Sequence, residues 1–300
     1  MPPLASRADI EYCRRLVQRH DLDGYLVSLF SPRAAREAVW AVRALNVEVV
    51  RAATGAAAGS APGSGSDAAA RLRLAFWRDS VQRMYSDTPD RTPVARSVHD
   101  AVQRHGISRT WLRRLVAERE RSLGAAGFAT VADVERYGER AYACLLHPHL
   151  EALGVRDMHA DNAARAIGVA TAIATATRSL PRLLAQRRCD LPADLVARHA
   201  VDVDDLYAAP RSTPQLQAAV YDLATRAYTR LCGAAEVYAP AAPPAAFPAL
   251  LAAVPVKHWL ERLEAANFDV FDRRLQHREL ALMWHLWRAS RRRTWAVGGK

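Results

Sequence analysis

The stretch ADNAARAIGVATAIATATR, residues 160–178, decides the fold class of this chain. Its apolar and small residues recur at the spacing of one helical face, and alanine or glycine fills many of its positions. Small side chains let neighbouring helices approach closely, since the distance between packed helices depends on the residues at the contact. We therefore expect a central, buried helix here, surrounded by other helices.

The same helical spacing recurs from end to end of the chain, and no stretch shows the period-two alternation of strands. Thr130 with Asp133 is typical of a helix start, and Pro148 predicts a kink in the helix that follows. The predicted helices lie at about 9–20, 33–49, 71–85, 92–105, 108–123, 130–153, 160–178, 192–199, 214–238, 244–254, 256–265 and 274–290.

The arrangement of these helices predicts one all-α domain over residues 1–300, with its core at about 9–290. Residues 54–69, TGAAAGSAPGSGSDAA, are of low complexity and contain little that can pack in a core. We expect them to form a flexible surface loop, the only linker in the chain.

Composition limits the class of protein. Half of the 300 residues are hydrophobic, which is enough for a sizeable core. No uninterrupted apolar run approaches the roughly 18–20 residues of a membrane-spanning helix. The net charge is +11, but the arginines alternate with acidic residues along helix faces, and no recognition motif accompanies the charge. We predict no nucleic-acid partner, although an acidic partner or anionic lipid remains compatible with the charge.

The cysteines and the amino-terminal residues indicate in which cellular compartment the protein is expected. Cys13, Cys144, Cys189 and Cys232 are far apart and form no C-x-x-C pair, so we expect reduced, mostly buried thiols in a non-secreted protein. The first eight residues contain no apolar core of a secretory signal. A mitochondrial presequence is not evident either.

Common catalytic and cofactor motifs are not found: there is no G-x-G-x-x-G, Walker loop, H-E-x-x-H or G-x-S-x-G. Cys144, His147 and Glu151 share one helix face and could hold a metal ion. A histidine on a mostly apolar helix is more often packed in the core, so we predict no metal site and no cofactor.

Two D-x-x-x-D pairs are present, and carboxylates at this spacing can hold Mg²⁺ against a diphosphate. Asp157 and Asp161 lie where a loop runs into a helix, and Asp190 and Asp194 flank Pro192 at another helix start. Acidic residues at such positions stabilise the helix dipole and cap free N–H groups. We interpret both pairs as structural.

Seven segments together resemble the squalene/phytoene synthase superfamily, in order and spacing, from Tyr12 to about Leu286. Within that superfamily the resemblance is to the group of mitochondrial complex I assembly factor 6 proteins. The segments are YCRRLVQRHDLDGYLVSLF (12–30), AVRALNVEVVRA (41–52), RLRLAFWRDSVQRMY (71–85), TPVA (92–95), LGVRDMHADNAARAIGVATAI (153–173), CDLPADLVARHAV (189–201) and FDVFDRRLQ (268–276).

The resemblance implies an isoprenoid-synthase-like helical bundle around a central cavity. In active members, two D-x-x-x-D motifs on facing helices bind Mg²⁺ and the prenyl diphosphates, and the metal stabilises the departing diphosphate. The corresponding positions are Val47 and Arg51 for the first motif, with Glu48 nearby, and Ser179 and Leu183 for the second. Pro181 lies inside the second motif, and we expect the helix to end just before it.

The resemblance therefore implies a non-catalytic assembly factor for complex I rather than an enzyme. It further implies a mitochondrial protein on the matrix side, peripherally held at the inner membrane, with complex I subunits or other assembly factors as partners. One alternative is a prenyl transferase that uses atypical ligands such as Glu48, Asp157 and Asp161.

A second alternative is a cavity that binds a lipid or isoprenoid without reaction. Arg43, Arg51, Arg178 and Arg182 lie near the former motif positions and could hold an anionic headgroup; the other interpretation is that they form ordinary surface or buried ion pairs. Near the end of the chain a stretch mixes aromatic and basic residues, which suits either a membrane interface or a solvated helix end. These residues are Trp284, Trp287, Arg288, Arg291, Arg292, Arg293 and Trp295.

Overall fold

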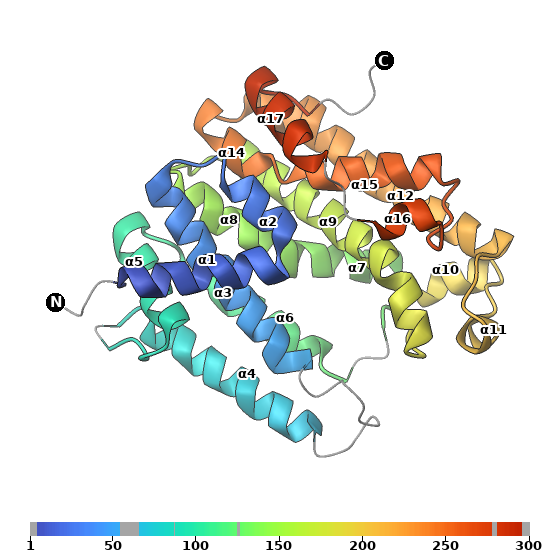
Figure 1. Ribbon diagram of the computed structural model, residues 1–300, viewed down its shortest axis with the longest axis horizontal. Coiled ribbons are helices and arrows are strands. Elements are labelled where there is room, and N and C mark those ends of the chain that lie inside the picture. Colours follow the sequence, from blue (N-terminus) through green and yellow to red (C-terminus); the bar gives the residue numbers. More distant parts are fainter. Residues whose placement is uncertain (1–4, 55–65, 87, 125–126, 278–280, 296–300) are drawn as a thin grey trace. The chain divides into compact units, whose positions relative to one another are not determined.

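The computed structural model describes residues 5–54, 66–86, 88–124, 127–277 and 281–295, and every regular element in these ranges is a helix (Figure 1). The predicted all-α class is therefore confirmed. Within the same ranges, no helix combines the length and the apolar character needed to cross a bilayer.

The helices follow one another along the whole described chain. The first part comprises α1 (Arg7–His20), α2 (Leu22–Ser28), α3 (Arg33–Thr54), α4 (Ser66–Arg83), α5 (Pro93–His105), α6 (Arg109–Ser122), α7 (Val131–Tyr137), the π-helix η1 (Gly138–Tyr142) and α8 (Ala143–Ala152). The remainder comprises α9 (Met158–Ala185), α10 (Ala193–Arg198), α11 (Val203–Ala208), α12 (Pro214–Gly233), the π-helix η2 (Ala234–Tyr238), α13 (Ala239–Ala241), the 3₁₀-helix η3 (Pro244–Ala246), α14 (Phe247–Leu250), α15 (Ala253–Ala265), α16 (Arg273–Gln276) and α17 (Leu282–Arg292).

Local sequence signals explain where several helices begin and end. The predicted cap at Thr130 is confirmed: its side chain accepts a hydrogen bond from the Asp133 backbone N–H, and Asp133 accepts one from the Thr130 backbone in return. Helix α5 has Pro93 in its first turn, which loses no helical hydrogen bond there, and it ends at Gly106 in the left-handed conformation.

Several boundaries differ from the prediction. Helix α3 continues past residue 49 to Thr54, and two separate helices, α16 and α17, lie where one was expected over 274–290. Residues 66–69 were expected in the loop but form the first turn of α4, while residues 55–65 of that loop lie outside the described residues. Helix α9 does not end before Pro181 but continues to Ala185. Leu180, Leu183 and Leu184 around the proline are all buried, and this packing outweighs the hydrogen bond that proline cannot donate.

The segment predicted as one helix over 130–153 is interrupted by the π-helix η1. One turn of wider helix inserts an extra residue, which shifts the faces of α7 and α8 relative to each other. Pro148 lies within α8, and the kink expected there stays a prediction.

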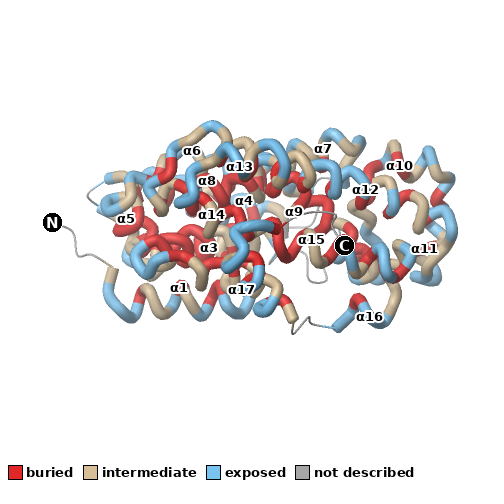
Figure 2. Tube along the Cα trace, turned by 90° about the horizontal axis from the view of Figure 1, so that it is seen from above, coloured by how far each residue is buried: buried red, intermediate tan, exposed pale blue. Residues whose placement is uncertain are grey.

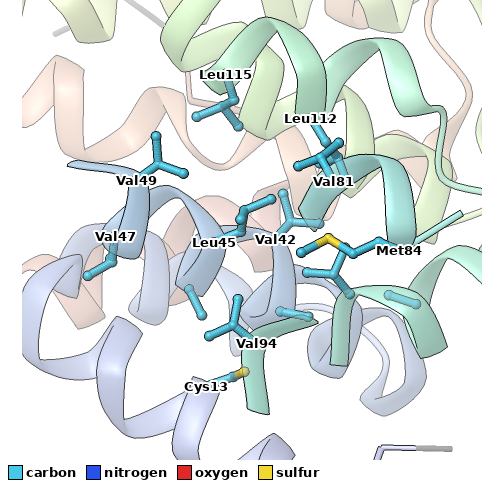
Figure 3. Close-up of a cluster of buried hydrophobic side chains, with 14 of the residues drawn as sticks. Cys13, Val42, Leu45, Val47, Val49, Val81, Met84, Val94, Leu112 and Leu115 are labelled. Carbon is cyan, nitrogen blue, oxygen red and sulfur yellow. The ribbon is translucent and has the colours of Figure 1, made fainter. Parts of the chain in front are cut away.

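The chain divides into two compact units. Unit 1 comprises Met1–Ala125, Cys144–Asp161 and Ala242–Ala249, and unit 2 comprises the rest. Helix α3 packs against α1, α4, α5 and α6 in unit 1, and much of its trace is buried (Figure 2). Fully buried residues such as Leu45 and Leu112 belong to the hydrophobic cluster between these helices (Figure 3). The prediction of one domain stays a prediction.

Unit 2 contains the long, alanine-rich part of α9, from Asn162 to Ala185. The predicted close approach is confirmed at two glycines: a Cβ on Gly168 would lie 2.5 Å from the Ala143 backbone nitrogen, and one on Gly138 would lie 2.6 Å from Val169 Cα. Only glycine leaves room for this crossing. Farther along the chain, α15 packs against both α12 and α17.

Candidate functional site

A hollow of about 630 Å³ lies in unit 1, between the carboxyl-terminal turn of α3 and the middle of α4. Its lining combines two cations, one carboxylate and two aromatic rings. The lining residues are Glu48, Arg51, Ala52, Thr54, Arg73, Phe76 and Trp77. Helical spacing explains the composition, because Arg73, Phe76 and Trp77 lie three and four residues apart and so share one face of α4.

The residue at the first aspartate position, Val47, belongs to the hydrophobic core. Its side chain is buried in the cluster that joins α1, α3 and α5, on the side of α3 opposite to Val49 (Figure 3). An aliphatic side chain in this position offers no ligand to a metal ion.

Glu48 provides the only carboxylate among the residues that line the hollow, and it already has two partners. It accepts a hydrogen bond from the Tyr12 hydroxyl at 3.2 Å, and Arg51 Nη1 lies 3.4 Å from its Oε1. Burial, followed by the charge of Glu48, raises the pKa of Tyr12, so the phenol stays protonated as a donor. Arg51 therefore places a positive charge beside the carboxylate, which disfavours a cation at this position.

Arg73 was missed by the sequence reasoning, although it lies in a segment that carries the resemblance. Its Nε donates to the Ala52 carbonyl at 3.1 Å, which holds the guanidinium beside the end of α3. In the sequence, the role of Arg73 is indicated only by its helical spacing from two aromatic residues, and such spacing is common on solvated helices.

The positions of the second motif lie on α9 in unit 2. Leu183 is buried, and the Ser179 hydroxyl donates to the Ala176 carbonyl of its own helix at 3.1 Å. Arg178 stacks over the Trp259 ring at 4.9 Å from its centroid, and Arg182 is exposed. The prediction that these positions and those on α3 line one cavity stays a prediction.

Arg43 has a structural partner in unit 1. Its Nη1 lies 2.6 Å from Asp21 Oδ2, and both side chains are largely shielded from solvent. The guanidinium passes so close to Gly24 that a Cβ there would lie 2.0 Å from Nη1. These contacts favour the interpretation of Arg43 as half of an ion pair over its role as an anion contact.

The residues weighed as metal ligands have other partners. The His147 ring stacks on Trp111 at 4.0 Å, and its Nδ1 lies 2.9 Å from Asp161. Glu151 accepts hydrogen bonds from the backbone and side chain of Ser108 at the start of α6. Burial raises the pKa of Cys144 to about 12, so the free thiol stays protonated, as is typical of a structural buried cysteine.

Both D-x-x-x-D pairs sit at helix starts, as predicted. Asp157 accepts a hydrogen bond from the Ala160 backbone N–H at 2.9 Å, at the start of α9. Asp194 lies in the first turn of α10 and accepts from the Val131 backbone N–H at 3.4 Å, while burial raises the pKa of Asp190. The contacts of Asp157 and Asp194 with backbone N–H groups at helix starts are those of structural caps.

Comparison with known proteins identifies the family of this chain. The sequence profile of the squalene/phytoene synthase family matches residues 17–281. NADH dehydrogenase (ubiquinone) complex I, assembly factor 6, of Homo sapiens is 32% identical over 284 residues, which cover 95% of this chain and 82% of that protein. The homologue of this assembly factor in Drosophila melanogaster is 33% identical over 263 residues, or 86% of this chain and 76% of that protein.

Two solved structures share the fold. A crystal structure of a dehydrosqualene synthase in complex with ligand superposes with a TM-score of 0.81 at 16% identity, covering 96% of both chains. The squalene synthase HpnC from Alicyclobacillus acidocaldarius gives a TM-score of 0.74 at 20% identity, over 87% of this chain and 95% of that one. The predicted helical isoprenoid-synthase fold is thereby confirmed. This chain belongs to the squalene/phytoene synthase family, and over nearly its whole length it is similar to complex I assembly factor 6.

Proposed function

We propose that this chain is a non-enzymatic assembly factor for mitochondrial respiratory complex I, built on a synthase fold that no longer transfers prenyl groups. The observation that carries the proposal is the extent of the similarity: assembly factor 6 of Homo sapiens matches 95% of this chain, so the match is not confined to a shared core motif. Fold alone would not distinguish an assembly factor from a synthase, because one fold hosts many functions.

The residues at the former motif positions support the loss of catalysis. Val47 is part of the hydrophobic core, Leu183 is buried, and Ser179 donates to its own helix. Arg51, at the second aspartate position of the first motif, brings a positive charge to the place where a synthase would hold Mg²⁺. Without the metal, the electrostatic stabilisation of a departing diphosphate is missing.

The proposed location and partners follow from the same similarity. The protein acts on the matrix side of the mitochondrial inner membrane, where it is peripherally associated and contacts complex I subunits or other assembly factors. The net charge of +11 is compatible with an acidic protein surface or with anionic lipid.

Deletion of the gene tests the proposal directly. We expect less assembled complex I on native gels and unchanged sterol and carotenoid levels, with assembly restored by the wild-type gene. A Glu48→Gln variant sharpens the test, because an atypical synthase that uses Glu48 as a ligand would lose function in that variant, whereas an assembly factor keeps it. Normal complex I in the deletion strain would contradict the proposal.

The purified protein provides the complementary test. Incubation with farnesyl or geranylgeranyl diphosphate and Mg²⁺ is expected to release no diphosphate above a protein-free control. Measurable release that disappears in Glu48→Gln would instead support a surviving prenyl transferase.

The hollow between α3 and α4 favours a second candidate, in which the chain retains a lipid or isoprenoid without converting it. Arg51 and Arg73 provide cations beside the rings of Phe76 and Trp77, a combination that suits an anionic headgroup attached to an apolar chain. We expect Arg51→Ala/Arg73→Ala to reduce any lipid that co-purifies with the wild type, measured by mass spectrometry. Arg71→Ala/Arg113→Ala, which removes two exposed arginines outside the hollow, is the matched control.

A further inference from the structure

Helix α17 has two faces of different character. Leu282, Leu286 and Ala289 form a buried stripe, and the helix packs against α15. This stripe accounts for the attachment of α17 to unit 2. The opposite face, however, is not the polar surface that solvated helices usually present.

The outward face carries three large apolar side chains. Met283, Trp284 and Trp287 are 40%, 52% and 54% exposed. Helical geometry places them together, since Met283 and Trp287 are four residues apart and Trp284 and Trp287 three. Single exposed apolar residues are normal, but two exposed tryptophans and a methionine on one face of an eleven-residue helix are not.

A group of arginines continues the same face toward the end of the helix. Arg291 follows Trp287 by four residues, and Arg288 follows Trp284 by four, with its guanidinium 5.3 Å from the Trp284 ring centroid. Arg292 and Arg293 are also exposed. Within the described part of the chain, none of these four arginines forms an ion pair with a carboxylate.

Arginines on two other helices do have carboxylate partners. Glu11 holds Arg14 and Arg15 on α1, and Glu135 holds Arg226 and Arg230 on α12. Paired charges of this kind are the ordinary way to solubilise a basic helix. On α17 the four neighbouring arginines have no such carboxylate among the described residues, and this concentration of positive charge favours an anionic partner.

We propose that the outward face of α17, defined by Met283, Trp284, Trp287, Arg288, Arg291 and Arg292, is a docking surface for an anionic lipid bilayer. Tryptophan rings lie favourably at the level of lipid headgroups, with the apolar ring surface toward the acyl chains. Arginine binds phosphate with two parallel hydrogen bonds, so the adjacent guanidinium groups match a layer of phosphodiesters. The helix, about 16 Å long, then lies flat in the interface.

Charge complementarity selects an anionic bilayer over a neutral one. Each arginine near an anionic surface contributes about a fivefold gain in binding, which is lost on a neutral surface. The apolar residues add an attraction that salt does not screen, so the two contributions can be measured separately.

Vesicle flotation of the full-length protein tests the surface. We expect flotation with phosphatidylcholine vesicles that contain phosphatidylglycerol, weak flotation with phosphatidylcholine alone, and partial release by salt. Arg291→Glu/Arg292→Glu should weaken binding by roughly 25-fold or more. Arg71→Glu/Arg113→Glu, which changes the net charge by the same amount at exposed sites on α4 and α6, should weaken it far less.

The tryptophans have a readout of their own. Brominated acyl chains should quench part of the emission of the wild-type protein, and Trp284→Phe/Trp287→Phe should remove that part while retaining flotation, because phenylalanine keeps the apolar contact. Circular dichroism confirms that each variant remains folded.

Two outcomes would overturn the proposal. If the wild-type protein does not float with anionic vesicles, the face is assigned to an acidic protein partner instead. If Arg291→Glu/Arg292→Glu and Arg71→Glu/Arg113→Glu weaken binding equally, the attraction comes from the net charge of the protein and not from α17.

The proposed function includes a peripheral contact with the inner membrane, and this inference names the surface that makes the contact. It rests on the proposed function only in identifying the membrane as the mitochondrial inner membrane. The vesicle experiment contains no complex I, so its failure leaves the assembly role intact. A deletion strain with normal complex I would leave the vesicle result unaffected.

Discussion

His149 is a buried polar residue in the interior of unit 1, and its burial makes the stability of the fold depend on pH. The side chain is buried, with Nε2 2.7 Å from the Ser31 hydroxyl, while its buried Nδ1 has no hydrogen-bond partner among the described residues. Burial, followed by the charge of Arg43, lowers the pKa of His149 to about 3. The imidazole of the folded protein therefore stays neutral at neutral and mildly acidic pH.

The free energy of unfolding is expected to fall as the pH decreases below about 6.5. An unfolded histidine takes up a proton near its ordinary pKa, whereas folded His149 does not until about pH 3, so acid favours the unfolded state between these values. The slope from this one group approaches about 1.4 kcal/mol per pH unit. Denaturant unfolding at steps between pH 7 and 5 measures it.

His149→Gln provides the comparison. This variant removes the titration, so the slope between pH 6.5 and 5 should become shallower even if the variant is less stable at every pH. His20→Gln, at an exposed position on α1, should leave the slope unchanged. Equal slopes in the wild type and His149→Gln would mean that His149 is not the group responsible.

The ion pair between Asp21 and Arg43 is expected to stabilise the fold, and one substitution tests this. Asp21→Asn removes the negative charge but leaves the buried guanidinium, whose side chain is 8% exposed. We expect a loss of about 2–4 kcal/mol in the free energy of unfolding, since an uncompensated buried charge is costly. Asp79→Asn, at an exposed pair with Arg78, should cost less than about 0.5 kcal/mol.

Among the elements, the crossing of α9 with η1 and the start of α8 depends on the absence of two side chains. Gly168→Ala would bring a methyl group to 2.5 Å from the Ala143 backbone nitrogen, and a backbone atom cannot move aside without shifting the helix. We expect the free energy of unfolding to decrease by about 1–3 kcal/mol. This loss should occur although alanine is the better helix former.

Gly233→Ala is the matched control for the crossing. Gly233 is also helical, at the end of α12, but a Cβ there would meet no atom within 4 Å. Thermal unfolding should show this variant unchanged or stabilised by up to about 1 kcal/mol, from helix propensity alone. A Gly168→Ala variant as stable as Gly233→Ala would show that α9 has room to move.

Helix positions were predictable from sequence where the apolar period was regular. The helices at 92–105 and 108–123 agree with α5 and α6 to within a residue at most boundaries, and the cap at Thr130 marked the start of α7. The π-helix η1 was not predictable, because its extra residue depends on packing against α9. Pro181 misled the prediction for a similar reason: the local preference was overruled by the buried leucines around it.

The candidate site was less accessible to sequence reasoning than the fold. The motif frame located Val47, Glu48 and Arg51, which share α3. It could not reveal that Tyr12 binds Glu48, because 36 residues separate the two, nor that Arg73 and Trp77 complete the hollow. Such contacts depend on how helices pack and not on any local pattern.

For the whole molecule, ligand binding to the native state distinguishes the three candidate functions. A synthase binds a prenyl diphosphate through Mg²⁺, and a ligand at a hundred times its dissociation constant stabilises the folded state by about 2.7 kcal/mol. In a protein of this size such a gain raises the midpoint of thermal unfolding by roughly 4 °C. Because Val47, Arg51, Ser179 and Leu183 supply no carboxylate, we expect no increase that depends on Mg²⁺.

Thermal unfolding with farnesyl diphosphate, in Mg²⁺ and separately in EDTA, makes the measurement. A shift of equal size in both solutions, reduced in Arg51→Ala/Arg73→Ala, would identify an isoprenoid held directly by arginines. No shift in either solution is expected of an assembly factor whose hollow binds no prenyl diphosphate. A shift that requires Mg²⁺ would contradict the loss of the metal site, because only a set of carboxylates somewhere in the chain could then hold the ion against the diphosphate.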